Sequence, residues 1–150
     1  MNFDNKTIKQ ILLRGNYITK EDAQKAKDFA KIHRVSFINY LFQENLITKD
    51  LLGQAIAESF KISYADLNST PPTSEQVQKI PEKIAKKYRA LIFKEENDKI
   101  IIATDNPENP NLLLELEKLF VNKKLSIAYS LSEDIDASFV HYQKKPELKI

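Results

Sequence analysis

One short stretch of this chain occurs almost twice, and this repeat constrains the fold more than any other feature of the sequence. Residues 16–20 read NYITK, and residues 45–49 read NLITK, 29 positions further along by the residue numbers. The same offset carries apolar positions onto apolar positions on both sides, for example Leu12 onto Leu41. A sequence that matches itself at a fixed offset indicates a tandem structural repeat. We therefore expect two copies of one supersecondary unit.

Each copy has the pattern of a helix, a turn and a second helix with a capped N-terminus. Asn16 and Asn45 tolerate the left-handed conformation that often ends a helix. Thr19 and Thr48 are suited to accept hydrogen bonds from the first N–H groups of the next helix. One αα-hairpin cannot cover its own apolar face, so two hairpins are expected to pack into a four-helix unit. The predicted hairpins comprise residues 8–30 and 37–59.

The pattern changes after residue 60. Residues 61–72 contain two prolines among Ser and Thr side chains, which predicts an extended connector. The stretch ALIFKEENDKIIIAT contains two β-rich runs around a polar turn and predicts an antiparallel hairpin. A leucine-rich helix, a third β-rich run (LSIAYSL) and a last helix from Ser132 follow. The predicted fold class is α+β: a helical tandem-repeat subdomain (1–60), the connector, an α+β subdomain with a largely antiparallel three-stranded sheet (73–145), and a tail (146–150).

The composition limits the classes of function. The formal net charge is only +2, which gives no general attraction to nucleic acid or to an anionic membrane surface. The absence of cysteine excludes disulfides and cysteine-bound metals, and two glycines are too few for a Walker A loop. No apolar run reaches the roughly 20 residues of a membrane span, so we expect no direct membrane insertion and a cytoplasmic location.

Candidate catalytic residues are few and scattered. His33 and His141 lie in unrelated segments. Pairs of glutamates that lie close together in the sequence are most simply interpreted as solvated surface. The strongest basic cluster, KIAKKYR at residues 83–89, could contact a phosphate or an acidic partner, but such a run is more often the wet side of a helix. The sequence therefore predicts neither an enzyme nor a resident metal or cofactor.

Three segments carry a resemblance to a known family. They are SFINYLFQENLITKDLLGQAIAESFKISYADL, KIPEKIAKKYRALIF and KIIIATDNPEN. Their order and spacing are similar to the N-terminal domain of type IV pilus assembly ATPases (PilB-like), a domain shared with type II secretion system ATPases (GspE-like) and named the MshE N-terminal-like family. The resemblance covers residues 8–142. Ile92 stands where proline is usual, and one extra residue separates Ala103 from the Asn-Pro pair, which leaves loop geometry open.

The resemblance implies a non-catalytic regulatory domain that binds other proteins. Members of the family carry an ATPase core later in the chain, and these 150 residues do not contain it. The chain is therefore expected to be a fragment or a stand-alone relative of such an ATPase. The implied partners are an inner-membrane platform protein, a PilZ-type regulatory protein, or the ATPase core of a parent chain. Through such partners the domain would lie at the cytoplasmic side of a bacterial inner membrane.

Some members of the wider family bind cyclic di-GMP on the helical repeat, through a motif that occurs twice. In that motif an arginine stacks on guanine, and a glutamine stands further along. Here Thr7 and Ser36 match the arginine positions, while Ala30 and Ser59 match the glutamine positions. The apolar scaffold is retained, but the groups that would recognise the base are replaced. We therefore expect no tight binding of cyclic di-GMP, and keep a cyclic di-GMP sensor as the alternative function.

Partner-binding residues are expected on the first hairpin. The second copy has Leu51 where the first has Asp22, so we expect the second to pack better and the first to be more mobile. Two of the candidates, Arg14 and Arg34, are also the residues that could serve a cyclic di-GMP sensor from positions outside the motif. The candidate partner-binding residues are Leu13, Arg14, Tyr17, Phe29 and Arg34.

Overall fold

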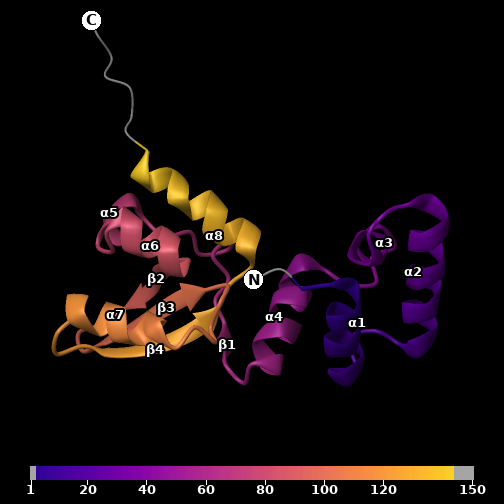
Figure 1. The fold of residues 1–150 in the computed structure, drawn as a ribbon, viewed down its shortest axis with the longest axis horizontal. Helices are drawn as coiled ribbons and strands as arrows, with labels where there is room; N and C mark the ends of the chain where they lie inside the picture. Colours follow the sequence, from indigo (N-terminus) through magenta and orange to yellow (C-terminus); the bar gives the residue numbers. More distant parts are fainter. Residues whose placement is uncertain (1–2, 144–150) are drawn as a thin grey trace, which may run out of the picture. The chain divides into compact units, whose positions relative to one another are not determined.

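The computed structural model describes residues 3–143 (Figure 1). The chain divides after Ile62 into two compact units. The described part of the first unit is helical, and the second combines helices with a four-stranded sheet. The predicted α+β class is therefore confirmed. The predicted tail, residues 146–150, lies outside the described residues.

The first unit contains four helices whose connecting turns repeat at the predicted offset. Asn16 N–H donates to Leu13 O at 3.1 Å, and Asn45 N–H donates to Phe42 O, also at 3.1 Å. Both asparagines adopt the left-handed conformation, with φ of 60° and 56°. The repeated turn predicted from the sequence is thus present in both copies. The helices are α1 (Asn5–Arg14), α2 (Lys20–His33), α3 (Phe37–Gln43) and α4 (Lys49–Ser59).

Side-chain caps start the helices where the sequence predicted them. Thr19 accepts from Asp22 N–H at 3.0 Å, and Thr48 accepts from Leu51 N–H at 3.2 Å. The Asp22 carboxylate also accepts from Thr19 N–H at 3.2 Å, which completes a reciprocal capping box. Ser36 caps α3 in the same way. These caps satisfy N–H groups that have no partner within their own helix.

The two copies share one hydrophobic core. Helix α2 packs on α3, and α1 packs on α4, so each helix of one copy contacts a helix of the other (Figure 1). Leu51 is 40% exposed, so the expectation that it contributes to the core of the second copy was wrong, whereas Ile56, at the position matching Lys27, is buried. Four buried residues come from each copy: Leu12, Ile18, Ala23 and Ala26 from the first, and Phe37, Leu41, Ile47 and Ala55 from the second.

The sheet of the second unit is mixed, in the order β1-β4-β3-β2. The predicted hairpin is present as an antiparallel pair of β2 and β3, with Ala90 opposite Thr104. β4 runs parallel to both β3 and β1, so the prediction of a largely antiparallel three-stranded sheet was wrong. Helix α7 (Asn111–Leu119) connects β3 to β4, and such a crossover sets the two strands parallel. The strands are β1 (Ser63–Tyr64), β2 (Ala90–Glu95), β3 (Lys99–Thr104) and β4 (Lys124–Tyr129).

Strand β1 was missed because it is only two residues long and lies in the stretch predicted as a connector. That stretch also carries Ala65 and Leu67, which are buried. Ala65 N–H donates to Tyr129 O at 2.7 Å, which extends the pairing with β4 by one residue. Backbone pairing and burial thus attach residues 63–67 to the second unit.

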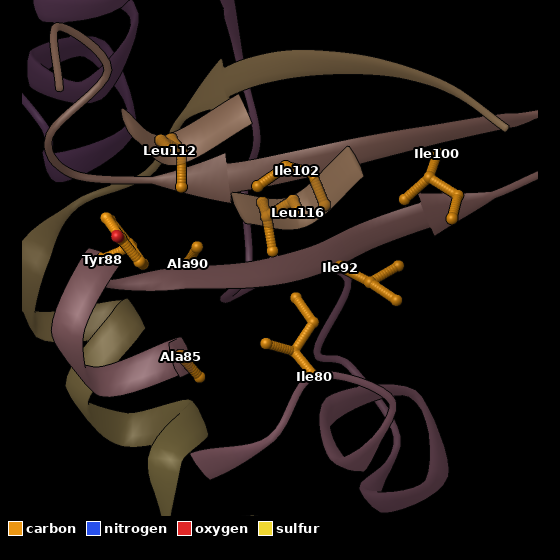
Figure 2. Close-up of a cluster of buried hydrophobic side chains, with 9 residues drawn as sticks. All are labelled: Ile80, Ala85, Tyr88, Ala90, Ile92, Ile100, Ile102, Leu112 and Leu116. Atoms are coloured by element: carbon orange, nitrogen blue, oxygen red, sulfur yellow. The ribbon is translucent and has the colours of Figure 1, made fainter. Parts of the chain in front are cut away.

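The helices and strands of the second unit enclose two hydrophobic clusters. Ile92 and Ile102 point into the cluster drawn in Figure 2, whereas their neighbours Leu91 and Ala103 belong to the other. Successive residues of a strand face opposite sides, so both faces of the sheet are buried in this region. The helices not yet described are α5 (Ser74–Gln78), α6 (Glu82–Tyr88), α8 (Ser132–Ser138) and the 3-10 helix η1 (Phe139–Tyr142).

The last predicted helix is shorter than its apolar spacing suggested. Ser132 is its first helical residue, and Leu131, which offers no side-chain cap, precedes it. The helix changes to 3-10 geometry at Phe139. The hydroxyl of Tyr142 then lies 2.5 Å from the carbonyl oxygen of Ile80 and 2.8 Å from that of Val77. This contact ties the end of the described chain to α5 and the loop after it.

Candidate functional site

A lysine-lined hollow, which we call the lysine pocket, lies on the helical unit. Its volume is about 580 Å³, within the range of about 300–1,000 Å³ typical of ligand pockets. Lys6 and Lys9 come from α1, and Lys27 and Lys31 stand one turn apart on α2. The pocket therefore presents positive charge from two helices. Its lining residues are Asn5, Lys6, Lys9, Lys27, Ala30, Lys31, Val35 and Phe37.

Among residues 3–143, the four pocket lysines form no salt bridges with neighbouring side chains. The pKa of Asp4 is lowered chiefly by hydrogen bonds from Thr7, and Lys6 makes a smaller contribution. Asp28, which lies between Lys27 and Lys31 in sequence, accepts a hydrogen bond from Gln24 at 2.9 Å. The pocket is thus a concentration of positive charge in a chain whose net charge is nearly zero.

The predicted partner-binding residues fall into separate places on the helical unit. Leu13 and Tyr17 line a hollow of about 310 Å³ at the turn between α1 and α2. Arg14 lines another hollow, of about 350 Å³, together with residues of α4. Phe29 packs against Tyr40, with ring centroids 4.9 Å apart, near the C-terminal end of α2. The structure therefore brings Leu13 and Tyr17 together but not all five residues.

Arg34 ends helix α2 in a left-handed conformation, with φ of 53°. Its side chain is exposed and is not part of the lysine pocket lining. Phe29 and Arg34 therefore form a second group of candidates, at the opposite end of α2 from Tyr17. His33 stacks on Phe29, with ring centroids 4.0 Å apart. This stacking gives His33 a packing contact near the C-terminal end of α2.

The ring of Tyr17 lies against the backbone of Gly15. A Cβ atom added to Gly15 would come within 2.7 Å of two ring carbons of Tyr17. Burial and a hydrogen bond to Glu58 of α4 raise the pKa of the Tyr17 hydroxyl. The corresponding positions of the second copy hold Glu44 and Leu46. The first copy differs from the second at both positions of this contact, with glycine in place of glutamate and tyrosine in place of leucine. This paired difference was a sequence signal for the contact, and the prediction from sequence did not use it.

The basic run at residues 83–89 is divided between structure and surface. Arg89 Nε donates to Asp105 Oδ2 at 2.7 Å, and a terminal nitrogen of Arg89 lies 2.8 Å from Asp136 Oδ1. Lys86 pairs with Glu82 at 2.7 Å on the exposed face of α6. Arg89 therefore joins the end of α6 to the end of β3 and to α8. This member of the basic run has a structural role.

Within residues 3–143 no helix is both long enough and apolar enough to cross a membrane. The same residues contain no group of three or more His, Cys, Asp or Glu side chains arranged to hold a metal ion. His141 lies in η1, and its carbonyl oxygen accepts from the Gln78 side chain at 3.1 Å.

Comparison with known families identifies the chain. A family model described as the MshEN domain matches residues 60–147. The chain belongs to the MshEN domain family. Type IV pilus assembly ATPase PilB of Pseudomonas aeruginosa is 28% identical over 98 residues, which is 65% of this chain and 17% of that protein. Bacteriophage adsorption protein B of Escherichia coli K12 is 26% identical over 136 residues, 89% of this chain and 18% of that protein.

A second PilB, from Acinetobacter baylyi, is 25% identical over 116 residues, 77% of this chain and 20% of that protein. The chain thus spans about a fifth or less of the length of these relatives. The predicted resemblance is confirmed: this MshEN chain is homologous to the N-terminal part of PilB.

Two solved structures share the fold. A structure of MshE with cdg superposes with a TM-score of 0.57 at 16% identity, and covers 91% of this chain and 98% of that one. The N-terminal domain of XpsE superposes with a TM-score of 0.50 at 16% identity, covering 94% and 97%. At these identities the two structures establish the fold and carry no residue of a binding site across.

Proposed function

We propose that this MshEN chain is a non-catalytic regulatory domain that docks a pilus-assembly or secretion ATPase onto a partner protein. The observation that carries this proposal is the match to PilB, which covers 65% of this chain but only 17% of the ATPase. A domain of this kind provides a binding surface, and ATP hydrolysis is carried out by the rest of the ATPase. Its partner would be an inner-membrane platform protein or a PilZ-type regulator, reached from the cytoplasmic side.

The first hairpin supports this proposal with a partly exposed surface at a turn of defined geometry. Leu13 and Tyr17 are partly exposed at the turn between α1 and α2, where they line the same hollow. Amphipathic aromatic side chains such as tyrosine are enriched at protein interfaces. The turn itself is fixed by the left-handed Asn16 and by the cap at Thr19. A docking contact there needs little reordering of the backbone.

A crosslinking experiment in cells tests the docking role. A photo-crosslinking amino acid is placed at Tyr17 of the full-length parent protein, and at Lys83 of α6 as an exposed control. We expect the Tyr17 position to capture a platform or regulatory protein under ultraviolet light, and Lys83 to capture much less. If both positions capture nothing beyond the parent protein itself, the docking role is contradicted.

The second candidate function is a cyclic di-GMP sensor. Two observations favour it: the structure of MshE with cdg shares this fold, and Ala30, at the glutamine position of the resembled motif, lines the lysine pocket. The lining, however, contains no arginine, and its one aromatic side chain, Phe37, is 3% exposed. A guanine base would find positive charge but no planar group on which to stack. This balance favours protein docking.

A further inference from the structure

The two copies of the repeat differ in charge at the lysine pocket. Each of the four lysines has an apolar residue at the matching position of the second copy. Two of these positions, Ile38 in α3 and Ile56 in α4, show that the repeated helices form with apolar side chains there. Lys9 and Lys27 are therefore not a requirement of the helix–turn–helix. At the 29-residue offset, the lysines 6, 9, 27 and 31 correspond to Val35, Ile38, Ile56 and Phe60.

The arrangement of these lysines opposes stability. Lys27 and Lys31 are exposed and stand at i and i+4 on α2, a spacing at which like charges destabilise a helix. On the same helix, Lys25 lies two residues before Lys27 and pairs with Glu21 at 3.2 Å, which shows the compensated arrangement. The pocket thus concentrates cations that the described carboxylates do not pair. Unpaired charge gathered in a hollow is the pattern of a site that attracts an oppositely charged partner.

The lining selects among anionic partners. Val35 is 40% exposed, and together with the half-buried Ala30 it forms an apolar part of the lining beside the lysines. An inorganic phosphate would fill little of the volume of about 580 Å³ and would leave this apolar part uncovered. A nucleotide would bring a base for which the lining offers no stacking group. An acidic polypeptide supplies several carboxylates and apolar side chains at once.

We propose that the lysine pocket binds an acidic segment of a partner protein. Carboxylates of that segment pair with lysines of α1 and α2, and an apolar side chain covers Val35. This inference rests on the proposed docking function and names the chemistry of one docking site, separate from the hollow at Tyr17. Because the attraction is between exposed charges, binding weakens as salt is added.

Fluorescence anisotropy tests the proposal with a short fluorescein-labelled peptide of glutamate and leucine. The variant Lys27→Glu with Lys31→Glu reverses two pocket charges, and Lys83→Glu with Lys87→Glu makes the same change at the same spacing on α6. All four lysines are exposed, so both variants are expected to fold, which circular dichroism checks. We expect the pocket variant to weaken binding at least about tenfold and the control less than about twofold.

A milder pair, Lys27→Gln with Lys31→Gln, is expected to give an intermediate loss and serves if the charge-reversed variant fails to fold. Unlabelled cyclic di-GMP and inorganic phosphate are added separately as competitors. The proposal is overturned if the pocket and control variants lose affinity equally, if the wild-type domain does not bind the peptide, or if either competitor displaces it at micromolar concentration. If the peptide experiment fails but a partner is still captured at Tyr17, the acidic ligand is rejected and the docking function is retained.

Discussion

The guanidinium Nε of Arg89 lies 2.7 Å from Oδ2 of Asp105, a carboxylate with no exposed surface. The contact joins the end of α6 to the end of β3, and Asp136 of α8 holds the other side of the same guanidinium at 2.8 Å. Both Arg89 and Asp105 belong to segments that carry the family resemblance. Their role in the structure is to hold helices against the sheet.

Replacing Arg89 with glutamine is therefore expected to destabilise the second unit. The change leaves the buried Asp105 carboxylate without its cation, a loss of about 3–5 kcal/mol for a fully buried pair. Because the Arg89 side chain is 31% exposed, we expect a smaller decrease in the free energy of unfolding, of about 2 kcal/mol. Urea unfolding followed by circular dichroism measures it. As a control, Lys86→Gln breaks the exposed pair with Glu82 and should change the free energy by less than about 0.5 kcal/mol.

Glycine is expected to be needed for stability at position 15 only because the Tyr17 ring lies against it. The φ of Gly15 is −83°, which alanine adopts readily, but an added Cβ would lie 2.7 Å from the Tyr17 ring. Gly15→Ala should therefore cost about 1–2 kcal/mol by displacing the ring. In a Tyr17→Leu background, which copies the second repeat, the same change should be neutral or stabilising by about 0.5 kcal/mol. An equal cost of Gly15→Ala in both backgrounds, measured in a double-mutant cycle, would refute the contact.

The repeated turns predict matched responses at Asn16 and Asn45. Both residues have positive φ, a conformation that costs roughly 1–2 kcal/mol for a residue with an ordinary side chain. Asn→Ala at either position should lower the free energy of unfolding by about 1 kcal/mol, whereas Asn→Gly should leave it nearly unchanged. Urea titration of the four single variants checks this. A large effect at one asparagine and none at the other would contradict equivalent turns.

The helical unit was predictable because its signals are local. Asn16, Thr19 and their counterparts act within a few residues of chain, so their types alone indicated where each helix ends and the next begins. The pairing of α1 with α4 depends on contacts distant in sequence, and neither it nor the pairing of α2 with the next helix, α3, was predicted. Leu51 shows the same limit, because an apolar residue at helical spacing was assumed to face the core.

The sheet topology was partly within reach of the sequence. A helix was predicted between the second and third β-rich runs, and a helix in that place sets the flanking strands parallel. The antiparallel assignment did not use this rule. Strand β1 is different, because two residues give no period to detect. The lysine pocket was also missed, since its cations come from positions 6 to 31 and meet only when α1 and α2 pack.

Alkaline pH is expected to destabilise the second unit through the buried Tyr129 and the half-buried Tyr142. Burial, and to a smaller extent Glu82, raise the pKa of Tyr142 from 10.0 to about 12. The unfolded chain releases this proton near pH 10, whereas the folded chain holds it to about pH 12. Stability is therefore complete below pH 10 and is lost as the pH rises through this interval. Burial raises the pKa of Tyr129 as well, and the loss of stability has the same sign.

The variant Tyr142→Phe separates the two tyrosines. It removes the hydroxyl that contacts the carbonyl oxygens of Ile80 and Val77, so it should lower stability at neutral pH by about 1 kcal/mol. It should also flatten the fall in stability between pH 10 and pH 11. Since the chain has no tryptophan, urea unfolding is followed by circular dichroism. An unchanged slope with pH would show that Tyr142 does not titrate as described.

Cyclic di-GMP is expected to bind this domain weakly or not at all. The lysine pocket supplies charge, but Thr7 is at the arginine position of the resembled motif and Ala30 is at its glutamine position. Calorimetry should therefore give no dissociation constant below about 1 μM, which corresponds to about −8.2 kcal/mol. The variant Thr7→Arg with Ala30→Gln restores both motif positions and should raise the affinity. Sub-micromolar binding by the unaltered domain would instead favour the sensor function over docking, because the lysines alone would then suffice to hold the nucleotide.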